Sequence, residues 1–218
     1  MAEPVLQRAV QIAAAGALLD GDLAVPQQAQ AVVLFAHGSG SSRHSPRNRR
    51  VAGAFQQAGY ATLLMDLLTG PEEDIDARTR QLRFDIPRLA ARLTGAVDWL
   101  AVQDDVASLP IALFGASTGA AAALMTAADR PDLVRLVISR GGRPDLAGEA
   151  LPRVRAPVLL IVGGHDRDVH RLNVQAASQM SAPVGITIIP GASHLFEEPG
   201  TLEAVIDTAV DALRQRLP

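Results

Sequence analysis

Short apolar segments alternate with longer segments of helical periodicity from residue 31 onward. The apolar runs with the length of buried strands are AVVLFAH (31–37), ATLLMDLL (61–68), PIALFGA (110–116), VRLVIS (134–139), PVLLIVGG (157–164) and GITIIPG (185–191). Segments near 47–58, 84–103, 117–129, 169–180 and 201–217 repeat apolar residues at intervals of three and four, which is typical of helices that bury one face. This alternation predicts an α/β fold, with an open, mostly parallel sheet and helices on both faces.

Two further segments complete the expected fold. Residues 5–25 read as two antiparallel strands joined near Gly16, and they extend the sheet at one edge. The apolar stretch within them contains Gln11 and lacks the features of a secretory leader, so we interpret it as part of this hairpin. The segment Thr69–Arg83 is charged and has no clear period, which predicts a long loop over one end of the sheet.

The composition excludes several classes of protein. At 218 residues and 22.9 kDa the chain has the size of one domain, which we expect to span 1–218. A net charge of −3 and a pI near 5.9 give no basic surface for a phosphate backbone, so we expect no nucleic-acid partner. The absence of cysteine excludes disulfides, thiolate metal sites and a cysteine nucleophile. No apolar run reaches the roughly 18 residues of a membrane span, so we expect a cytoplasmic protein without a membrane partner.

A serine stands in a sequence pattern that exposes and activates its hydroxyl. Gly115-Ala116-Ser117-Thr118-Gly119 matches G-x-S-x-G, and it lies between the strand PIALF and the helix AAALMTAA. A sharp turn from strand to helix strains the serine backbone and accepts only small neighbours, and glycine stands two positions away on each side. The turn also places the hydroxyl at a helix N-terminus, where the dipole favours negative charge. We therefore predict that Ser117 is a nucleophile rather than a helix cap.

A serine nucleophile needs a base, and the base needs an acid that orients it. Asp166 and His194 each follow the carboxyl end of a predicted strand, at the sheet edge that carries Ser117. The chain order therefore predicts Asp166 as the acid and His194 as the general base. Asp168 competes for the role of the acid, but it precedes a helical stretch directly and is predicted to cap that helix.

Cleavage of an acyl bond also requires hydrogen-bond donors for the oxyanion. They are normally the main-chain N–H after the nucleophile and a second N–H from the loop that follows the strand 31–37. That loop is rich in glycine and reads HGSGSS over 37–42. The pattern predicts Ser39 and Thr118 as the two donors, with His37 bracing the start of the loop.

Arginines supply positive charge near the expected site. Arg140 stands at the carboxyl end of a strand, where it either binds a carboxylate or phosphate of the substrate or forms a structural ion pair. Arg43, Arg47, Arg49 and Arg50 follow the glycine-rich loop. We interpret these four as a solvated loop and the first turn of a helix.

Taken together, these motifs resemble those of the α/β-hydrolase superfamily, and most closely those of small dienelactone-hydrolase-like proteins. The matching runs are HGSGSSRHSPRNRR (37–50), GASTG (115–119), SRGGRPDL (139–146), VGGHDRDV (162–169) and GASHLFEEPG (191–200). The resemblance implies an α/β-hydrolase fold with a triad of Ser117, Asp166 and His194. Dienelactone hydrolases use a cysteine nucleophile, whereas this chain contains none, so the resemblance favours a serine carboxylesterase. Relatives that share the first run also occur fused to a phosphoribosyltransferase domain, which we expect this chain to lack.

These predictions converge on a serine hydrolase that cleaves small esters through an acyl-enzyme on Ser117, with no metal or organic cofactor. Only Arg140–Ala156 separates the strands between which relatives insert a cap, so we expect an open site without a cap domain. An open site and an aromatic content of 3% favour short acyl groups. Two other functions use the same residues: a ligand-binding protein with slow turnover, and an acyltransferase or perhydrolase in which an amine or peroxide replaces water.

Overall fold

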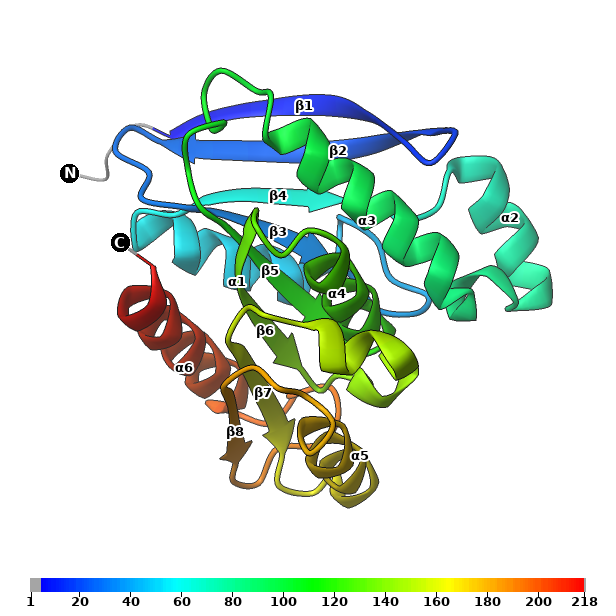
Figure 1. Cartoon of the computed structure of the whole chain (residues 1–218), viewed down its shortest axis with the longest axis vertical. Helices are drawn as coiled ribbons and strands as arrows, with labels where there is room; N and C mark the ends of the chain where they lie inside the picture. Colours follow the sequence, from blue (N-terminus) through cyan, green and yellow to red (C-terminus); the bar gives the residue numbers. More distant parts are fainter. Residues whose placement is uncertain (1–4, 218) are drawn as a thin grey trace.

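The predicted strands lie side by side in one sheet. Within residues 5–217, the part of the chain that the computed structural model describes, eight strands are joined in the order β1-β2-β4-β3-β5-β6-β7-β8. Their bounds are Val5–Ala14 (β1), Ala17–Pro26 (β2), Val32–Ala36 (β3), Ala61–Met65 (β4), Ile111–Ala116 (β5), Val134–Arg140 (β6), Val158–Gly163 (β7) and Val184–Ile189 (β8). Strands β4, β3, β5, β6, β7 and β8 pair parallel with their neighbours in this order. The pairs β1–β2 and β2–β4 are antiparallel. The predicted mostly parallel sheet is therefore confirmed (Figure 1).

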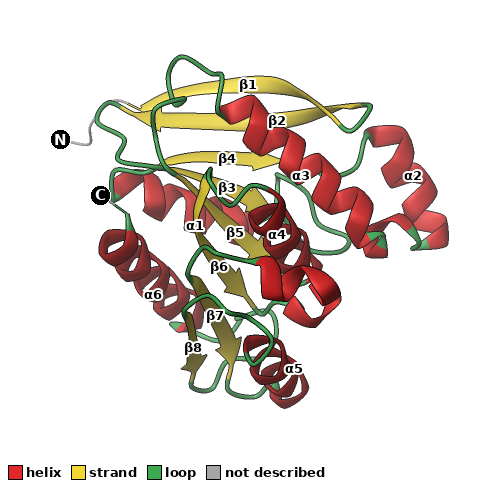
Figure 2. Cartoon of the chain, in the orientation of Figure 1, coloured by secondary structure: helices red, strands yellow, loops and turns green. Residues whose placement is uncertain are grey.

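Helices cover both faces of this sheet, as the periodicity predicts (Figure 2). Their bounds are Pro46–Gln57 (α1), Gly70–Thr79 (α2), Leu82–Phe84 (η1), Ile86–Leu100 (α3), Thr118–Asp129 (α4), Pro144–Arg153 (η2), Arg167–Ala177 (α5) and Thr201–Arg216 (α6). One hydrophobic cluster packs α3 and α4 against the sheet, and a second packs α1 and α6 against the opposite face. The strands between them are buried on both sides, which is why they read as continuous apolar runs.

The N-terminal strands form the predicted edge hairpin. Ala14 pairs with Ala17, so only Ala15 and Gly16 make the turn, with φ of 48° and 74°. Positive φ at both central residues is the geometry of a type I′ turn, which matches the twist of the strands beside it. Exposed and buried side chains alternate along the second half of β1. One face of the strand packs against α3, and the other face is exposed to solvent.

The prediction of a loop over Thr69–Arg83 is wrong, because most of this segment is helical. Helix α2 begins with a capping box: the main-chain N–H and the hydroxyl of Thr69 both donate to the Glu72 carboxylate, at 2.8 and 2.9 Å. Glu72 also accepts a hydrogen bond of 2.6 Å from Arg92 of α3. Hydrophobic periodicity does not detect α2 because the only residue that it buries is the charged Asp76.

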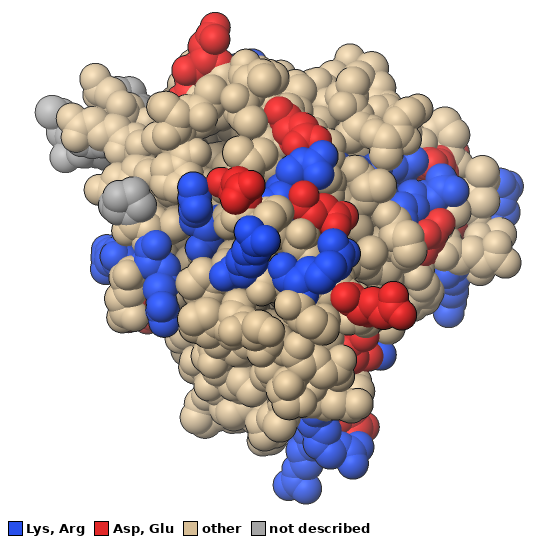
Figure 3. Space-filling view, in the orientation of Figure 1, with Lys and Arg blue, Asp and Glu red and all other residues tan. Residues whose placement is uncertain are grey.

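Basic and acidic side chains are interspersed on the face that Figure 3 shows. The arginines that follow β3 form ion pairs with acidic side chains: Arg47 contacts Glu197 at 3.0 Å, Arg49 contacts Asp22 at 3.3 Å, and Arg43 is bound to Asp66. Arg47, Arg49 and Arg50 lie in α1, as their interpretation as a first helical turn requires. The loop residue Arg43 is less solvated than expected, because its side chain is only 21% exposed. Among residues 5–217, no helix combines the length and the apolar character that crossing a bilayer demands.

Candidate active site

Ser117 lies on a strained turn between β5 and α4. Its φ and ψ are 51° and −121°, a backbone conformation that residues other than glycine rarely adopt. Such a conformation persists only where the surrounding structure enforces it. A Cβ on Gly115 would lie 2.5 Å from the Cα of Ala120, and a Cβ on Gly119 would overlap the Ala36 carbonyl oxygen. The two glycines are therefore required by close packing, as the G-x-S-x-G pattern predicts.

His194 and Asp166 meet at the same edge of the sheet. The His194 Nδ1 lies 2.6 Å from the Asp166 Oδ2. Because the carboxylate can only accept, Nδ1 carries the proton in the neutral ring and Nε2 keeps a free lone pair. The Asp166 side chain is largely buried, whereas the His194 side chain is 38% exposed and can be reached from solvent.

Arg140 and Gly141 link this pair to Ser117. The Ser117 N–H donates to the Arg140 carbonyl at 3.3 Å, and a Cβ on Gly141 would lie 3.6 Å from the His194 Nδ1. The three residues predicted as a triad are thus brought to one short stretch of the sheet edge. Within the described residues, the His194 ring bonds to Asp166 and forms no hydrogen bond with the Ser117 hydroxyl. Hydrogen bonds between a base and its proton donor are often long in structures without a bound ligand.

The loops that carry Asp166 and His194 also contact each other directly. The His165 N–H donates to the Ala192 carbonyl at 2.9 Å, and a Cβ on Gly163 would lie 2.5 Å from the same oxygen. The Glu198 carboxylate accepts a hydrogen bond of 3.0 Å from the Ser193 N–H, and this bond lowers the pKa of Glu198. Sequence reasoning missed Glu198, although a carboxylate shortly after a histidine loop is a recognisable partner for free main-chain N–H groups.

The prediction that Asp168 caps the following helix is wrong. Helix α5 begins at Arg167, so Asp166 occupies the N-cap position while its side chain bonds to His194. Asp168 lies one residue inside the helix, where it is exposed and pairs with Arg171 at 2.5 Å. The helix begins two residues earlier than its apolar periodicity indicates, because Arg167 and Asp168 are exposed and carry no hydrophobic signal.

The two predicted oxyanion donors, Ser39 and Thr118, lie next to each other. We call Gly38–Ser42 the oxyanion loop; a Cβ on Gly38 would lie 3.0 Å from the Ser117 Cβ. Within the described residues, the main-chain N–H groups of Ser39 and Thr118 donate no hydrogen bond, so both are free to bind an anion. Their hydroxyls lie 3.0 Å apart.

His37 braces the start of this loop, as predicted. Its Nε2 accepts a hydrogen bond of 3.0 Å from the Leu67 N–H, so Nδ1 carries the proton and donates to the Gly38 carbonyl at 3.0 Å. Burial lowers the pKa of His37, which keeps the ring neutral near pH 7.

Arg140 is buried without a counter-ion. The residue is 9% exposed, its Nη1 has no hydrogen-bond partner, and it forms no ion pair with any described residue. The alternative that Arg140 makes a structural ion pair is therefore wrong for residues 5–217. Burial, together with the nearby charge of Arg47, lowers the pKa of Arg140 to about 10, which still leaves it charged at pH 7.

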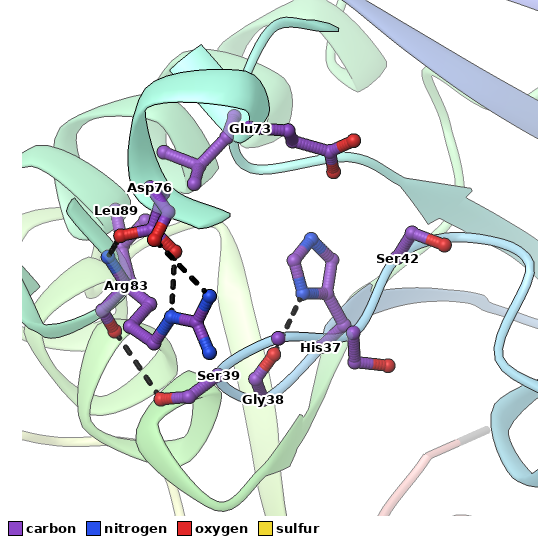
Figure 4. Close-up of a pocket in the computed structure, with 11 residues that line it drawn as sticks. His37, Gly38, Ser39, Ser42, Glu73, Asp76, Arg83 and Leu89 are labelled. Carbon is purple, nitrogen blue, oxygen red and sulfur yellow. Dashed lines mark hydrogen bonds and ion pairs between the residues drawn. The ribbon is translucent and has the colours of Figure 1, made fainter. Parts of the chain in front are cut away.

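A cavity of about 260 Å³ lies behind the oxyanion loop. The loop and His37 line one side, while Glu73 and Asp76 of α2, Arg83 of η1 and Leu89 of α3 line the other (Figure 4). Ser117 does not line this cavity, but it lies next to the loop: a Cβ on Gly38 would be 3.0 Å from the Ser117 Cβ. The helix that sequence reasoning missed therefore forms a wall beside the candidate site.

The chain is similar to proteins of known family. The sequence profile of the dienelactone hydrolase family matches residues 19–217. The solved structure of a dienelactone hydrolase from Anabaena variabilis is 55% identical and superposes with a TM-score of 0.96, over 98% of this chain and 99% of that chain. Est1E from Butyrivibrio proteoclasticus has the same fold, with a TM-score of 0.78 at 17% identity over 95% of this chain and 98% of that chain.

One curated relative has a different name. A Mycobacterium tuberculosis protein that is named as a phosphoribosyl transferase is 55% identical over 208 residues. These residues make up 95% of this chain but only 46% of that protein, so the chain spans about half the length of the relative. The name describes the longer protein, whereas the similarity covers only 46% of its length.

Proposed function

Because this chain belongs to the dienelactone hydrolase family and has the α/β-hydrolase fold, we propose that it is a serine carboxylesterase. In this proposal Ser117 is the nucleophile, His194 the general base and Asp166 the acid that orients His194. The Anabaena relative is named for a lactone, which is a cyclic ester, and this supports an ester as the substrate class. With no cysteine in the sequence, a thiolate nucleophile is excluded, and Ser117 takes that place in this proposal.

The reaction proceeds in two acyl transfers. The Ser117 Oγ attacks the ester carbonyl carbon and gives its proton to the His194 Nε2. The main-chain N–H groups of Ser39 and Thr118 bind the oxyanion of the tetrahedral intermediate, which then expels the alcohol with the proton from His194. Water next attacks the acyl-enzyme, again through His194, and releases the acid and free Ser117.

The single observation that carries this proposal is the hydrogen bond of 2.6 Å between the His194 Nδ1 and the Asp166 Oδ2. It fixes the tautomer that leaves Nε2 as a base, and it supplies a negative charge for the imidazolium that forms during attack. A histidine that only supported the fold would not need a buried carboxylate at this nitrogen. The strained backbone of Ser117 supports the same conclusion from the other side of the site.

The substrate that we propose is a small ester with a short acyl chain. The segment between β6 and β7 holds only the short helical turns of η2, which leaves no cap domain over the site. We also propose that Arg140 favours esters with an anionic group, because it is a buried cation with no acid partner among the described residues.

Hydrolysis of p-nitrophenyl esters tests this proposal. We expect kcat/KM to be highest from acetyl to butyryl and to fall steeply by octanoyl, and Ser117→Ala to lower kcat at least about a thousandfold. Ser108→Ala is the matched control, because Ser108 is an exposed serine in the turn after α3. Activity that survives Ser117→Ala would refute the nucleophile, and a preference for octanoyl would refute the open site.

A further inference from the structure

The oxyanion loop is connected to the segment formed by α2 and η1. Arg83, in η1, contacts the loop in two ways. Its main-chain carbonyl accepts a hydrogen bond of 3.3 Å from the Ser39 hydroxyl. Its Nη1 lies 2.9 Å from the position that a Cβ on Gly40 would take, so the guanidinium packs directly against Gly40, whose φ of 67° also favours glycine.

Asp76 of α2 holds Arg83 in this position. Its carboxylate accepts hydrogen bonds from the Arg83 main-chain N–H at 3.0 Å and from Nε at 2.6 Å, and its carbonyl lies 3.4 Å from Nη2 (Figure 4). The Asp76 side chain is 4% exposed, so these charge-assisted bonds form away from water. A buried carboxylate that binds both the main chain and the side chain of one residue fixes the backbone of η1.

The Ser39 hydroxyl connects η1 to Thr118, the residue after Ser117. Its hydroxyl has one proton, which it donates to the Arg83 carbonyl, so it accepts the proton of the Thr118 hydroxyl at 3.0 Å. The side chains of the two residues whose N–H groups are the expected oxyanion donors are thus joined to each other and to η1. A displacement of η1 would change the distance between the two donors.

His37 braces only the start of the loop, and Ser39 makes the hydrogen bond that joins the loop to η1. The cavity of about 260 Å³ lies between Gly38–Ser42 and the side chains of Glu73 and Asp76 of α2. The polar contacts through Ser39 and Arg83 cross this gap. Donors in an oxyanion hole must be held within about 0.5 Å of their productive geometry to stabilise the transition state, so a loop that borders a cavity gains from such a connection.

We propose that Asp76, Arg83 and the Ser39 hydroxyl are positioning residues that hold the oxyanion loop against Thr118. None of the three side chains touches the substrate in this account; they act through the main chain of Ser39. The segment formed by α2 and η1, which carries Asp76 and Arg83, thereby supports the active site. The kinetic consequence of this inference rests on the proposed function, whereas the structural consequence does not.

Amide order parameters of Gly38–Ser42, measured by ¹⁵N relaxation on the whole protein, test the structural consequence. We expect values near about 0.85 in the wild type and below about 0.6 in Ser39→Ala and in Asp76→Asn. Asp74→Asn is the matched control: Asp74 lies on the same helix, is exposed and does not line the cavity. Unchanged order parameters in both test variants, or an equal drop in Asp74→Asn, would overturn the inference whatever the ester kinetics show.

Hydrolysis of p-nitrophenyl acetate tests the kinetic consequence. We expect Ser39→Ala and Asp76→Asn to lower kcat about tenfold or more with KM within about twofold of the wild type, because oxyanion donors act mainly in the transition state. Ser39→Thr should restore kcat, since it keeps the hydroxyl. If the loop loosens while kcat stays at the wild-type value, the positioning role is refuted. If the loop loosens but the wild type cleaves no ester, the connection holds and the proposed function fails.

Discussion

The His194 Nδ1 and the Asp166 Oδ2 lie 2.6 Å apart although 28 residues separate them in the chain. Parallel pairing of β7 with β8, in which Gly163 is opposite Ile189, brings the two loops to one edge of the sheet. The His165 N–H bond to the Ala192 carbonyl then locks the loops together. Any account of function has to explain why a largely buried carboxylate is directed at this imidazole nitrogen.

Asp166→Asn should lower kcat for p-nitrophenyl acetate about 10³- to 10⁴-fold, because an amide favours the wrong histidine tautomer and cannot stabilise the imidazolium. Asp168→Asn should leave kcat within about twofold of the wild type, because Asp168 is exposed and pairs only with the exposed Arg171. Steady-state kinetics on the two purified variants check both values. The opposite pattern would make Asp168 the orienting acid.

Arg140→Ala should raise KM for esters with a carboxylate or phosphate about ten- to a hundredfold and leave KM for neutral esters unchanged. Arg135→Ala is the matched control, because Arg135 lies on the same strand but is exposed. Paired kinetics on an anionic and a neutral ester of equal acyl length provide the measurement. Equal losses on both esters would mean that Arg140 supports the edge of the site without selecting the substrate.

The free energy of unfolding should fall as pH drops below about 6.5, because burial lowers the pKa of His37. The unfolded chain takes up a proton at this histidine before the folded chain does, so acid favours unfolding over that range. Denaturant titrations at pH 7.5, 6.5 and 5.5 measure the slope, and His37→Gln should flatten it. A slope unaffected by His37→Gln would contradict this prediction.

Glu72 should stabilise the fold at neutral pH and cease to do so in acid. Its hydrogen bond to Arg92 lowers the pKa of Glu72 to about 2, so its contribution is complete above about 4.5 and is lost as pH falls toward 2. Glu72→Gln should cost about 2–3 kcal/mol at pH 7, because Arg92 is buried and would lose its only acid partner among the described residues. Chemical denaturation measures the loss, and Asp74→Asn, on the same helix, should cost far less.

Much of the sheet and one part of the site could be predicted from the sequence for physical reasons. Strands buried on both faces, such as β3 and β5, give unbroken apolar runs, and the turn at Ser117 requires glycine at 115 and 119. Helix α2 could not be found in this way because it buries a charged residue, Asp76, instead of an apolar stripe. Its capping box, Thr69 to Glu72, is a local signal that hydrophobic periodicity ignores.

Other features depend on contacts that no local pattern encodes. The bond between Ser39 and the Arg83 carbonyl joins positions 44 residues apart, and the isolation of Arg140 is visible only once its neighbours are placed. Apolar periodicity places the start of α5 near residue 169, because the polar first residues of the helix carry no apolar signal. It therefore predicts Asp168 as the cap, whereas Asp166 occupies that position.

Covalent labelling by a fluorophosphonate, followed by peptide mass spectrometry, tests the central claim most directly, because the reagent reacts with an activated serine and spares ordinary ones. We predict one modified residue, Ser117, with labelling abolished in Ser117→Ala and slowed at least about a hundredfold in His194→Ala. Ser108→Ala should label at the wild-type rate. Failure of the wild type to label, modification at another serine, or an unchanged rate in His194→Ala would contradict the proposal that Ser117 is a nucleophile activated by His194.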